Sequence, residues 1–339
     1  LMSIPTDQSA TTDRLDRPLR DLRISVTDRC NYRCNYCMPY DEYLWIDRND
    51  LLSFEEITRL ARLFTDIGVD RIRLTGGEPL VRRGLHRLVD QLAALPRLKD
   101  LSLTTNGALL AEKAFDLRSA GLDRINVSLD TLSEDRFLEL TKRGKLEEVM
   151  RGIQRAQAAG FRPIKINSVI IKGFNDDEIL DLAEYGRSKN LEMRFIEFLD
   201  VGNSNTWSLD RTVPKDAIHK IISSRYPLEE VGRSGDRAPS VDYRYVDGKG
   251  RIGIIGSLTE PFCSSCTRAR LTADGRLVTC LFSESGFDLK TPLRAGKSDA
   301  ELGHTIRSIW NTRTDRYSDK RLEAIKAGSY KPGRKIEMI

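Results

Sequence analysis

Residues 22–37 read LRISVTDRCNYRCNYC, a strand-like run followed by three closely spaced cysteines, Cys30, Cys34 and Cys37. Iron–sulfur cubanes are normally held by four cysteine thiolates, so the CxxxCxxC spacing leaves one iron free for another ligand. A structural zinc site is the alternative, but it needs four ligands. None of the three histidines of the chain is near this segment. The pattern therefore favours an open iron–sulfur cluster at the end of a first strand.

A second group of three cysteines, Cys263, Cys266 and Cys280, has the pattern CxxC…C and accounts for the remaining thiols of the chain. A zinc ribbon is the serious alternative here, because CxxC pairs are common in zinc sites. No fourth cysteine and no adjacent histidine remains to complete such a site. We therefore expect a second [4Fe–4S] cluster, whose open iron is available to a substrate.

The composition is that of an ordinary globular protein, with 339 residues, 40% hydrophobic and 31% charged. No apolar run reaches the ~20 residues that cross a bilayer, and the start of the chain lacks a hydrophobic signal core. We therefore expect a cytoplasmic protein with no membrane contact. The net charge of +5 is compatible with an acidic substrate but too small to indicate nucleic-acid binding. Clustered cysteines in a reducing compartment indicate metal binding or redox chemistry rather than disulfide bonds.

Short strand-like runs alternate with amphipathic helical stretches over the first two-thirds of the chain. This alternation indicates parallel strands with right-handed crossovers, and six units predict an α/β fold, a partial (βα)6 TIM-like barrel. Ligands of such a barrel are expected at the carboxyl ends of its strands. The expected strands are 22–27, 72–75, 101–104, 125–129, 164–171 and 191–198, and the expected helices are 54–67, 85–95, 111–120, 146–159 and 178–189.

After about residue 214 the pattern changes to an α+β region. It contains an expected helix at 215–224, strands at 241–245 and 252–255, a hairpin that turns at Asp274-Gly275, and a helix at 299–311. Capping boxes, Ser53 with Glu56 and Ser298 with Glu301, mark two helix starts. The predicted division is a flexible arm at 1–20, a barrel at 21–225 and a C-terminal region at 226–339.

Basic side chains recur on the strand faces that would line this barrel. Buried cations without partners are costly, and an anionic ligand removes that cost. Arginine pairs bind phosphate bidentately, although a solvated strand edge is the alternative for an isolated RAR sequence. The interior is therefore predicted to hold a polyphosphate. The residues are Arg73 with Thr75, Lys165 with Asn167, Arg194, and the pair Arg268 and Arg270 beside the second trio.

Two further motifs follow the expected second and fourth strands. The glycines of TGGEP, residues 75–79, let the backbone approach a ligand closely, and Glu78 can accept a hydrogen bond from an ammonium group. NVSLD places Asn126, Ser128 and Asp130 on one strand face. A simple turn is the alternative for TGGEP, but its position after CxxxCxxC favours cofactor binding.

The CxxxCxxC motif after a first strand resembles the radical S-adenosylmethionine superfamily. The ordered set of both cysteine trios, RxR, TGGEP, TTNG and EFLDVGN is similar to the GTP 3′,8-cyclase family of molybdenum-cofactor biosynthesis, from about residue 14 onward. The resemblance implies a partial barrel that a C-terminal region with the second cluster caps on its open side. It implies that the first [4Fe–4S] cluster and S-adenosylmethionine generate a 5′-deoxyadenosyl radical, and that the second cluster binds the guanine of GTP. The radical would take hydrogen from ribose C3′, and C3′ would then bond to guanine C8.

The same resemblance implies roles for individual residues. Positions around S-adenosylmethionine are matched by Tyr36, Gly77, Ser128 and Leu199, and the family often carries Met in place of Leu199. Glu78 is added to this predicted cofactor site because its carboxylate can accept a hydrogen bond from an ammonium group. The chain ends KIEMI where the family has a double glycine. The resemblance also implies an external one-electron donor, a homodimer, and hand-off of the product to cyclic pyranopterin monophosphate synthase. GTP would be held by Arg23, Arg73, Thr104, Lys165, Arg268 and Arg270. Arg194 is added to this predicted substrate site because it lies on a strand face that would line the barrel.

Two other functions compete with this interpretation. A different radical S-adenosylmethionine enzyme, such as a peptide-modifying one, usually carries more auxiliary cysteines and does not need RxR beside them. A metal-stabilised nucleotide- or RNA-binding module would use aromatic stacking, and the aromatic content of 7% offers no such platform.

Overall fold

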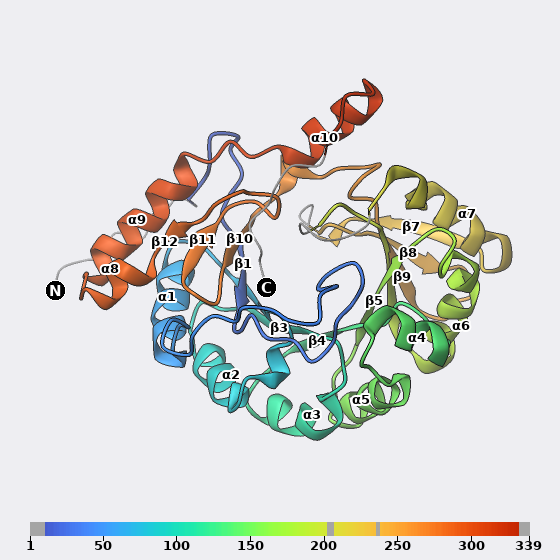
Figure 1. Cartoon of the computed structure of the whole chain (residues 1–339), viewed down its shortest axis with the longest axis horizontal. Helices are drawn as coiled ribbons and strands as arrows, with labels where there is room; N and C mark the ends of the chain where they lie inside the picture. Colours follow the sequence, from blue (N-terminus) through green and yellow to red (C-terminus); the bar gives the residue numbers. More distant parts are fainter. Residues whose placement is uncertain (1–10, 202–206, 235–237, 332–339) are drawn as a thin grey trace.

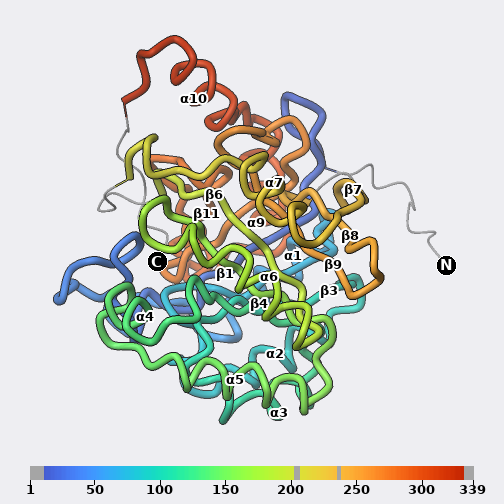
Figure 2. Tube along the Cα trace, turned by 90° about the vertical axis from the view of Figure 1, so that its right-hand side faces the viewer, coloured from blue at the N-terminus to red at the C-terminus, as the bar shows by residue number. Residues whose placement is uncertain are grey.

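The computed structural model describes residues 11–201, 207–234 and 238–331. Within these residues one curved sheet runs through the whole molecule, in the strand order β12-β11-β10-β1-β2-β3-β4-β5-β6-β9-β8-β7. Figure 1 shows the strands bent into a ring with helices packed around its outside. Seen from the side in Figure 2, α2, α3 and α5 lie at one end of the molecule and α10 projects at the other.

The predicted strand–helix alternation is confirmed. Successive strands β1 to β6 are parallel, and the apolar faces of the helices form one buried core with the outer face of the sheet. The short helix α4 was not predicted. The strands are β1 (Asp21–Ser25), β2 (Arg71–Thr75), β3 (Asp100–Thr105), β4 (Arg124–Ser128), β5 (Lys165–Ile170) and β6 (Glu192–Glu197). The helices are α1 (Phe54–Asp66), α2 (Leu85–Ala93), α3 (Leu110–Ser119), α4 (Glu134–Thr141), α5 (Leu146–Ala158) and α6 (Ile179–Lys189).

The C-terminal region extends this sheet at both edges. After α7 (Lys215–Arg225), β9 (Arg251–Ile255) pairs in parallel with β6, and β10 (Arg268–Leu271) pairs in parallel with β1. The region therefore lengthens the barrel wall by adding strands at both of its edges. Antiparallel strands complete both edges: β7 (Leu228–Gly232), β8 (Val241–Tyr245), β11 (Arg276–Val278) and β12 (Phe287–Asp288).

Three further helices follow these strands, namely α8 (Lys290–Arg294), α9 (Asp299–Asn311) and α10 (Tyr317–Lys326). Both predicted capping boxes are present, at the starts of α1 and α9. No helix in the described part of the chain is long and apolar enough to cross a membrane.

Residues 11–20, predicted as part of a flexible arm, are packed in the structure. Arg17 and Leu19 are 2% and 1% exposed. The indole N–H of Trp310 in α9 donates to the carbonyl oxygen of Arg17 at 3.0 Å. Because this partner is almost 300 residues away, no local pattern revealed the packing. Residues 1–10 and the C-terminal KIEMI lie outside the described residues.

Two helical glycines differ in the space around them. A Cβ on Gly152 in α5 would lie 2.6 Å from the carbonyl oxygen of Gly107 and 3.1 Å from the Cβ of Leu110, whereas Gly303 in α9 has only the Arg307 guanidinium at 3.8 Å. Alanine favours a helix over glycine by about 1 kcal/mol. We expect Gly303→Ala to raise the free energy of unfolding by up to about that amount and Gly152→Ala to lower it. Chemical denaturation of both variants measures this, and equal stabilisation would contradict the packing.

Candidate active site

The first cysteine trio forms a tight turn beyond the carboxyl end of β1. The amides of Cys37 and Met38 both donate to the Cys34 carbonyl, at 3.0 and 2.9 Å. Burial raises the pKa of Cys34, and the charges of Cys37, Asp130 and Cys30 raise it further. The thiols are therefore within electrostatic reach of one another. The amide of Tyr32 donates to the Cys30 sulfur at 3.5 Å.

The glycines of TGGEP pack against the backbone that leads into this turn. A Cβ on Gly76 would lie 2.4 Å from the Thr27 carbonyl oxygen, and one on Gly77 would lie 2.4 Å from that of Arg29. The amides of Gly77 and Glu78 donate to these two oxygens at 2.9 and 2.8 Å. The glycines thus permit close approach of two protein segments, whereas the sequence suggested close approach to a ligand. The contact of Gly77 with S-adenosylmethionine stays a prediction.

Glu78 is 1% exposed, and its carboxylate joins the loops after β2 and β3. It accepts from the Leu80 amide at 2.9 Å, from the Thr105 hydroxyl at 2.7 Å and from the Asn106 amide at 2.7 Å. Burial raises its pKa to about 7 even though these hydrogen bonds lower it. Protein donors therefore already engage both oxygens, and the predicted contact with an ammonium group stays a prediction.

A cavity of about 310 Å³ lies beside the first trio. The Tyr36 hydroxyl donates to Asp130 Oδ2 at 2.7 Å, and the amide of Val169 donates to Asp130 Oδ1 at 2.7 Å. Asp130 therefore ties Tyr36 to β5, a role that the NVSLD motif did not reveal. Ser128 ends β4 and Leu199 follows β6, at the same carboxyl edge. The cavity is lined by Asn35, Tyr36, Pro39, Glu139, Leu140, Ile171, Phe174, Phe198 and Arg211.

The second trio lies at the opposite end of the parallel strands. Cys263 and Cys266 precede β10, and Cys280 follows β11, which is antiparallel to β10. Since β10 runs parallel to β1, this places the second trio at the amino end of β1 and the first trio beyond its carboxyl end. A five-residue strand spans about 17 Å. The two trios are therefore separated by the barrel interior, over about the length of one strand.

Arginines surround the second trio. Nη2 of Arg313 lies 3.4 Å from the Cys266 sulfur, and Nη2 of Arg268 lies 3.8 Å from it. Burial by itself raises the pKa of Cys266, but the charges of Arg268 and Arg313 bring it down to about 6. Burial raises the pKa of Cys280 to about 11. The thiolate form is therefore favoured most strongly at Cys266.

Both trios fit an iron–sulfur cluster in their donor chemistry, because each offers three thiols with N–H donors directed at a sulfur. Across residues 11–331, apart from the two undescribed loops, no three His, Cys, Asp or Glu side chains converge on the position of one metal ion. The thiolates of a cubane each bind a different iron, so they stand further apart than the ligands of one zinc ion.

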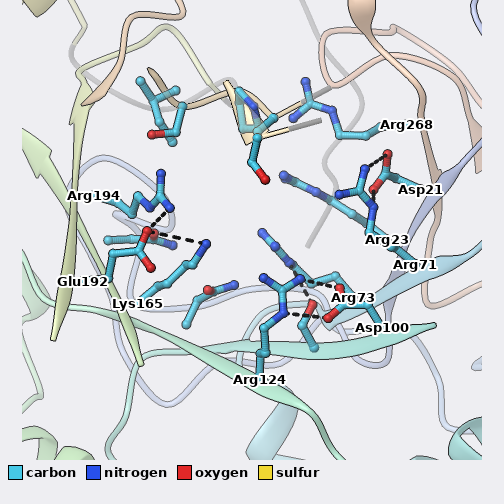
Figure 3. Close-up of a pocket in the computed structure, with 18 of the residues that line it drawn as sticks. Asp21, Arg23, Arg71, Arg73, Asp100, Arg124, Lys165, Glu192, Arg194 and Arg268 are labelled. Atoms are coloured by element: carbon cyan, nitrogen blue, oxygen red, sulfur yellow. Dashed lines mark hydrogen bonds and ion pairs between the residues drawn. The ribbon is translucent and has the colours of Figure 1, made fainter. Parts of the chain in front are cut away.

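A second cavity, of about 260 Å³, opens at the amino ends of the barrel strands. Figure 3 shows basic and acidic side chains that converge on it from opposite walls. The first trio lies at the carboxyl ends, where the fold leads us to expect ligands, whereas this cavity lies at the opposite ends of the strands. Thr104 and Arg270 are not among its lining residues. Of the predicted phosphate-binding residues, Arg23, Arg73, Lys165, Arg194 and Arg268 line it.

Apart from Arg268, the outer row of charges in this cavity is ion-paired. Strand register aligns Arg268, Asp21, Arg71 and Asp100, so their signs alternate across four strands. Arg71 Nε lies 2.8 Å from Asp21 Oδ1. Arg194, predicted to bind substrate, already has two carboxylate partners. The remaining pairs are Arg124 with Asp100, Arg194 with Glu192 and Asp242, and Lys165 with Glu192 at 3.7 Å.

The next row inward is not paired. Register aligns Arg270, Arg23 and Arg73 on three adjacent strands, and no carboxylate of the described residues forms an ion pair with them. Burial, and then repulsion by neighbouring arginines, lowers the pKa of Arg23 well below its usual value. Burial lowers the pKa of Arg73 and of Arg270 to about 10. Guanidinium groups keep their charge in proteins, so this row calls for an anionic ligand.

Comparison with known proteins agrees with this geometry. Residues 24–186 match the family model "Radical SAM superfamily", and residues 191–319 match "Molybdenum Cofactor Synthesis C". A relative from Staphylococcus epidermidis named GTP 3′,8-cyclase is 45% identical over 91% of this chain and 92% of its own length. One of the same name from Acidothermus cellulolyticus is 50% identical over 91% of this chain and 88% of its own. The chain belongs to the GTP 3′,8-cyclase family.

Solved structures support the fold of this GTP 3′,8-cyclase family member. SuiB of Streptococcus suis bound to its precursor peptide SuiA has a TM-score of 0.61 at 16% identity, over 87% of this chain and 68% of SuiB. SuiB bound to S-adenosylmethionine has a TM-score of 0.58 at 16% identity, over 86% of this chain and 68% of SuiB. At this identity the likeness shows the radical S-adenosylmethionine fold alone.

Sequence reasoning missed several residues of these sites. Arg71 shares a strand face with Arg73, so the period-two rule applied from the first residue of β2 would have found it. Arg17 and Arg313, which contact the second trio, carry no local signal. Their partners are distant in the chain, and only the folded structure brings them together.

The two rows of charge predict opposite effects of removing an arginine. Arg23 has no carboxylate partner among the residues that the structure describes, so Arg23→Met should raise the free energy of unfolding of the ligand-free protein by about 1–3 kcal/mol. Arg71→Met leaves Asp21 without its ion pair and should lower it. Denaturation under anaerobic conditions measures both, with and without inorganic tripolyphosphate. Tripolyphosphate should protect Arg23→Met less than the wild type, and a destabilised Arg23→Met would contradict the unpaired row.

Proposed function

We propose that this chain is a radical S-adenosylmethionine enzyme that converts GTP to 3′,8-cyclo-7,8-dihydroguanosine 5′-triphosphate, the first step of molybdenum-cofactor biosynthesis. The observation that carries the proposal is the unpaired row Arg270, Arg23 and Arg73, which lies between two open cysteine trios. Membership in a family whose curated relatives are named GTP 3′,8-cyclase supports it.

At the carboxyl end of the barrel, Cys30, Cys34 and Cys37 would hold one [4Fe–4S] cluster. With S-adenosylmethionine bound, it supplies the 5′-deoxyadenosyl radical, and an external one-electron donor provides the electron. The protein's part is to hold the cofactor. The cavity beside Tyr36 has mostly apolar walls suited to an adenine ring. The carboxyl edge that carries Gly77, Ser128 and Leu199 would hold the methionyl part.

At the amino end, Cys263, Cys266 and Cys280 would hold a second [4Fe–4S] cluster that takes the guanine base of GTP. The inner arginine row and Arg268 neutralise the triphosphate, since arginine pairs bind phosphate oxygens bidentately. Lys165 and Arg194 approach from the opposite wall, and Thr104 lies deeper on β3. Base and phosphates held at one end leave the ribose between the trios. The proposed reaction there is hydrogen removal from C3′ and bond formation between C3′ and C8, after which the external donor supplies a second electron that is taken up with a proton to give the 7,8-dihydro product.

A peptide-modifying enzyme is the alternative within the same fold. A peptide backbone is neutral and offers nothing to compensate three adjacent, partly buried arginines, whereas a triphosphate does. We further propose that the enzyme acts as a homodimer and that its product passes to cyclic pyranopterin monophosphate synthase.

The isotopic fate of the ribose hydrogen tests this function. Incubation of the reconstituted protein with S-adenosylmethionine, a reductant and GTP deuterated at C3′ should give singly deuterated 5′-deoxyadenosine and a product isomeric with GTP. Mass spectrometry measures both. GTP deuterated at C2′ is the matched control and should give unlabelled 5′-deoxyadenosine. Unlabelled 5′-deoxyadenosine from the C3′ substrate, or equal turnover of ATP, would refute the proposal.

Lys165 predicts a pH dependence of GTP binding. Burial, and then the charge of Arg194, lowers its pKa to about 8, although Glu192 opposes the shift. The protonated amine attracts phosphate, so affinity should fall as pH rises above about 8, by up to about tenfold per pH unit. Equilibrium dialysis between pH 7 and 9 measures the effect. Lys165→Met should bind more weakly at pH 7 and lose this step, and an unchanged pH profile in the variant would disprove the assignment.

A further inference from the structure

Four charged residues, three of them buried, form a cluster beside the second trio and outside the arginine-lined cavity. Asp13 and Arg17 come from the N-terminal segment, and Arg313 and Asp315 come from the turn after α9. Asp13, Arg17 and Arg313 are 5%, 2% and 5% exposed. We call these four residues the Asp13–Asp315 network. Nothing in the reaction itself requires charges at this position.

Arg17 and Arg313 bind the backbone of the CxxC turn from two sides. Nη1 of Arg17 donates to the Cys263 carbonyl oxygen at 2.7 Å. Nη1 of Arg313 donates to the Cys266 carbonyl oxygen at 2.9 Å, and its Nη2 lies 3.4 Å from the Cys266 sulfur. One guanidinium therefore holds both the backbone and the thiol of the same cysteine.

The two acids of the network hold these arginines in place. Asp13 Oδ2 accepts from Arg17 Nε at 2.7 Å and from Arg313 Nη1 at 3.1 Å, so one carboxylate joins both arginines. The Asp315 carbonyl accepts from Arg17 Nη1 at 2.8 Å, and its carboxylate accepts from Arg313 Nε at 3.3 Å. The indole of Trp310 also lies against the Arg313 guanidinium, with the guanidinium carbon 4.5 Å from the ring centroid.

The network also reaches the third cysteine. The Thr279 hydroxyl donates to Asp315 Oδ2 at 2.6 Å, and Thr279 directly precedes Cys280. All three cysteine positions of the second trio are thus tied to one cluster of charges. Cys263 and Cys266 lie in the turn before β10, whereas Cys280 lies after β11, so something must keep these two segments in mutual register.

We propose that the Asp13–Asp315 network is the support of the second iron–sulfur site, with Arg313 as the positioning residue for Cys266. The inference rests on the proposed function, because it requires a cluster at the second trio. Residues around the ligands of a metal centre orient them and tune the centre, and loss of such residues weakens metal binding. The N-terminal segment, with Asp13 and Arg17, is therefore part of this site.

Arg313 also sets the charge around the bound cluster. A cationic donor to a ligand sulfur stabilises the more negative, reduced cluster and so raises its reduction potential. Lysine keeps the positive charge of arginine, but it lacks the planar guanidinium that reaches a carboxylate, a carbonyl and a sulfur at once. Arg313→Lys should therefore keep the cluster bound but lose the donor to the ligand sulfur, so the reduction potential of the cluster should become more negative. Arg313→Met should lose the cluster.

The experiment compares Arg313→Met and Arg313→Lys with wild type and with Arg187→Met. Arg187 is a matched control, because its side chain is 7% exposed and ion-paired to Asp247 at 2.5 Å but contacts neither trio. Wild type and Arg187→Met should carry about eight irons after anaerobic reconstitution, and Arg313→Met about four. Cleavage of S-adenosylmethionine without GTP, which reports the first site, should persist in all four proteins.

A potentiometric titration followed by electron paramagnetic resonance gives the second readout. The second-cluster signal should be absent in Arg313→Met and should appear at a more negative potential in Arg313→Lys. Full iron content in Arg313→Met with a wild-type potential would overturn the inference and leave the proposed function intact. About four irons in the wild type itself would instead refute the assignment of a second cluster to Cys263, Cys266 and Cys280. If Arg313→Met also loses the first cluster, the test depends on Arg313→Lys. An unchanged reduction potential of the second cluster in Arg313→Lys would then overturn the inference.

Discussion

The parallel pairing of β1 with β10 is the contact on which the arrangement of both sites depends. β10 comes from the C-terminal region, almost 250 residues after β1, and it brings the RxR motif into register with the first strand of the barrel. Because both strands run the same way, the cysteines before β10 and those after β1 lie at opposite ends. The barrel interior is thereby bounded by one cysteine trio at each end, with arginines between them.

This pairing also explains why the interior carries uncompensated charge. Its register places Arg268 beside Asp21, which carries the opposite charge, and Arg270 beside Arg23, where like charges lie side by side. A protein gains no stability from three adjacent, partly buried arginines, and their lowered pKa values reflect the cost of desolvating them. An anion that binds this row would remove that cost. The paired outer row holds its carboxylates in place and leaves the inner row to the ligand.

The ends of the described chain contribute to the second site as much as the strands do. The segment with Asp13 and Arg17 packs between α9 and the CxxC turn, although its sequence is polar and resembles a mobile tail. The turn after α9 returns Arg313 to the same place. Three segments far apart in the sequence thus meet at one set of cysteines, which ties the site to completion of the whole fold.

The sequence by itself determined the β/α alternation, both capping boxes, the cysteine trios and the basic character of the barrel interior, because each depends on periodicity or spacing within a short stretch. Only the tertiary structure decided which charges are paired: Arg194 has Glu192 and Asp242, whereas Arg23 forms no ion pair within the described part of the chain. It also placed the cationic cavity at the amino ends of the strands, packed residues 11–20, and gave Arg313 its role. These features depend on strand register and on contacts between distant segments, and no local pattern of residues encodes either.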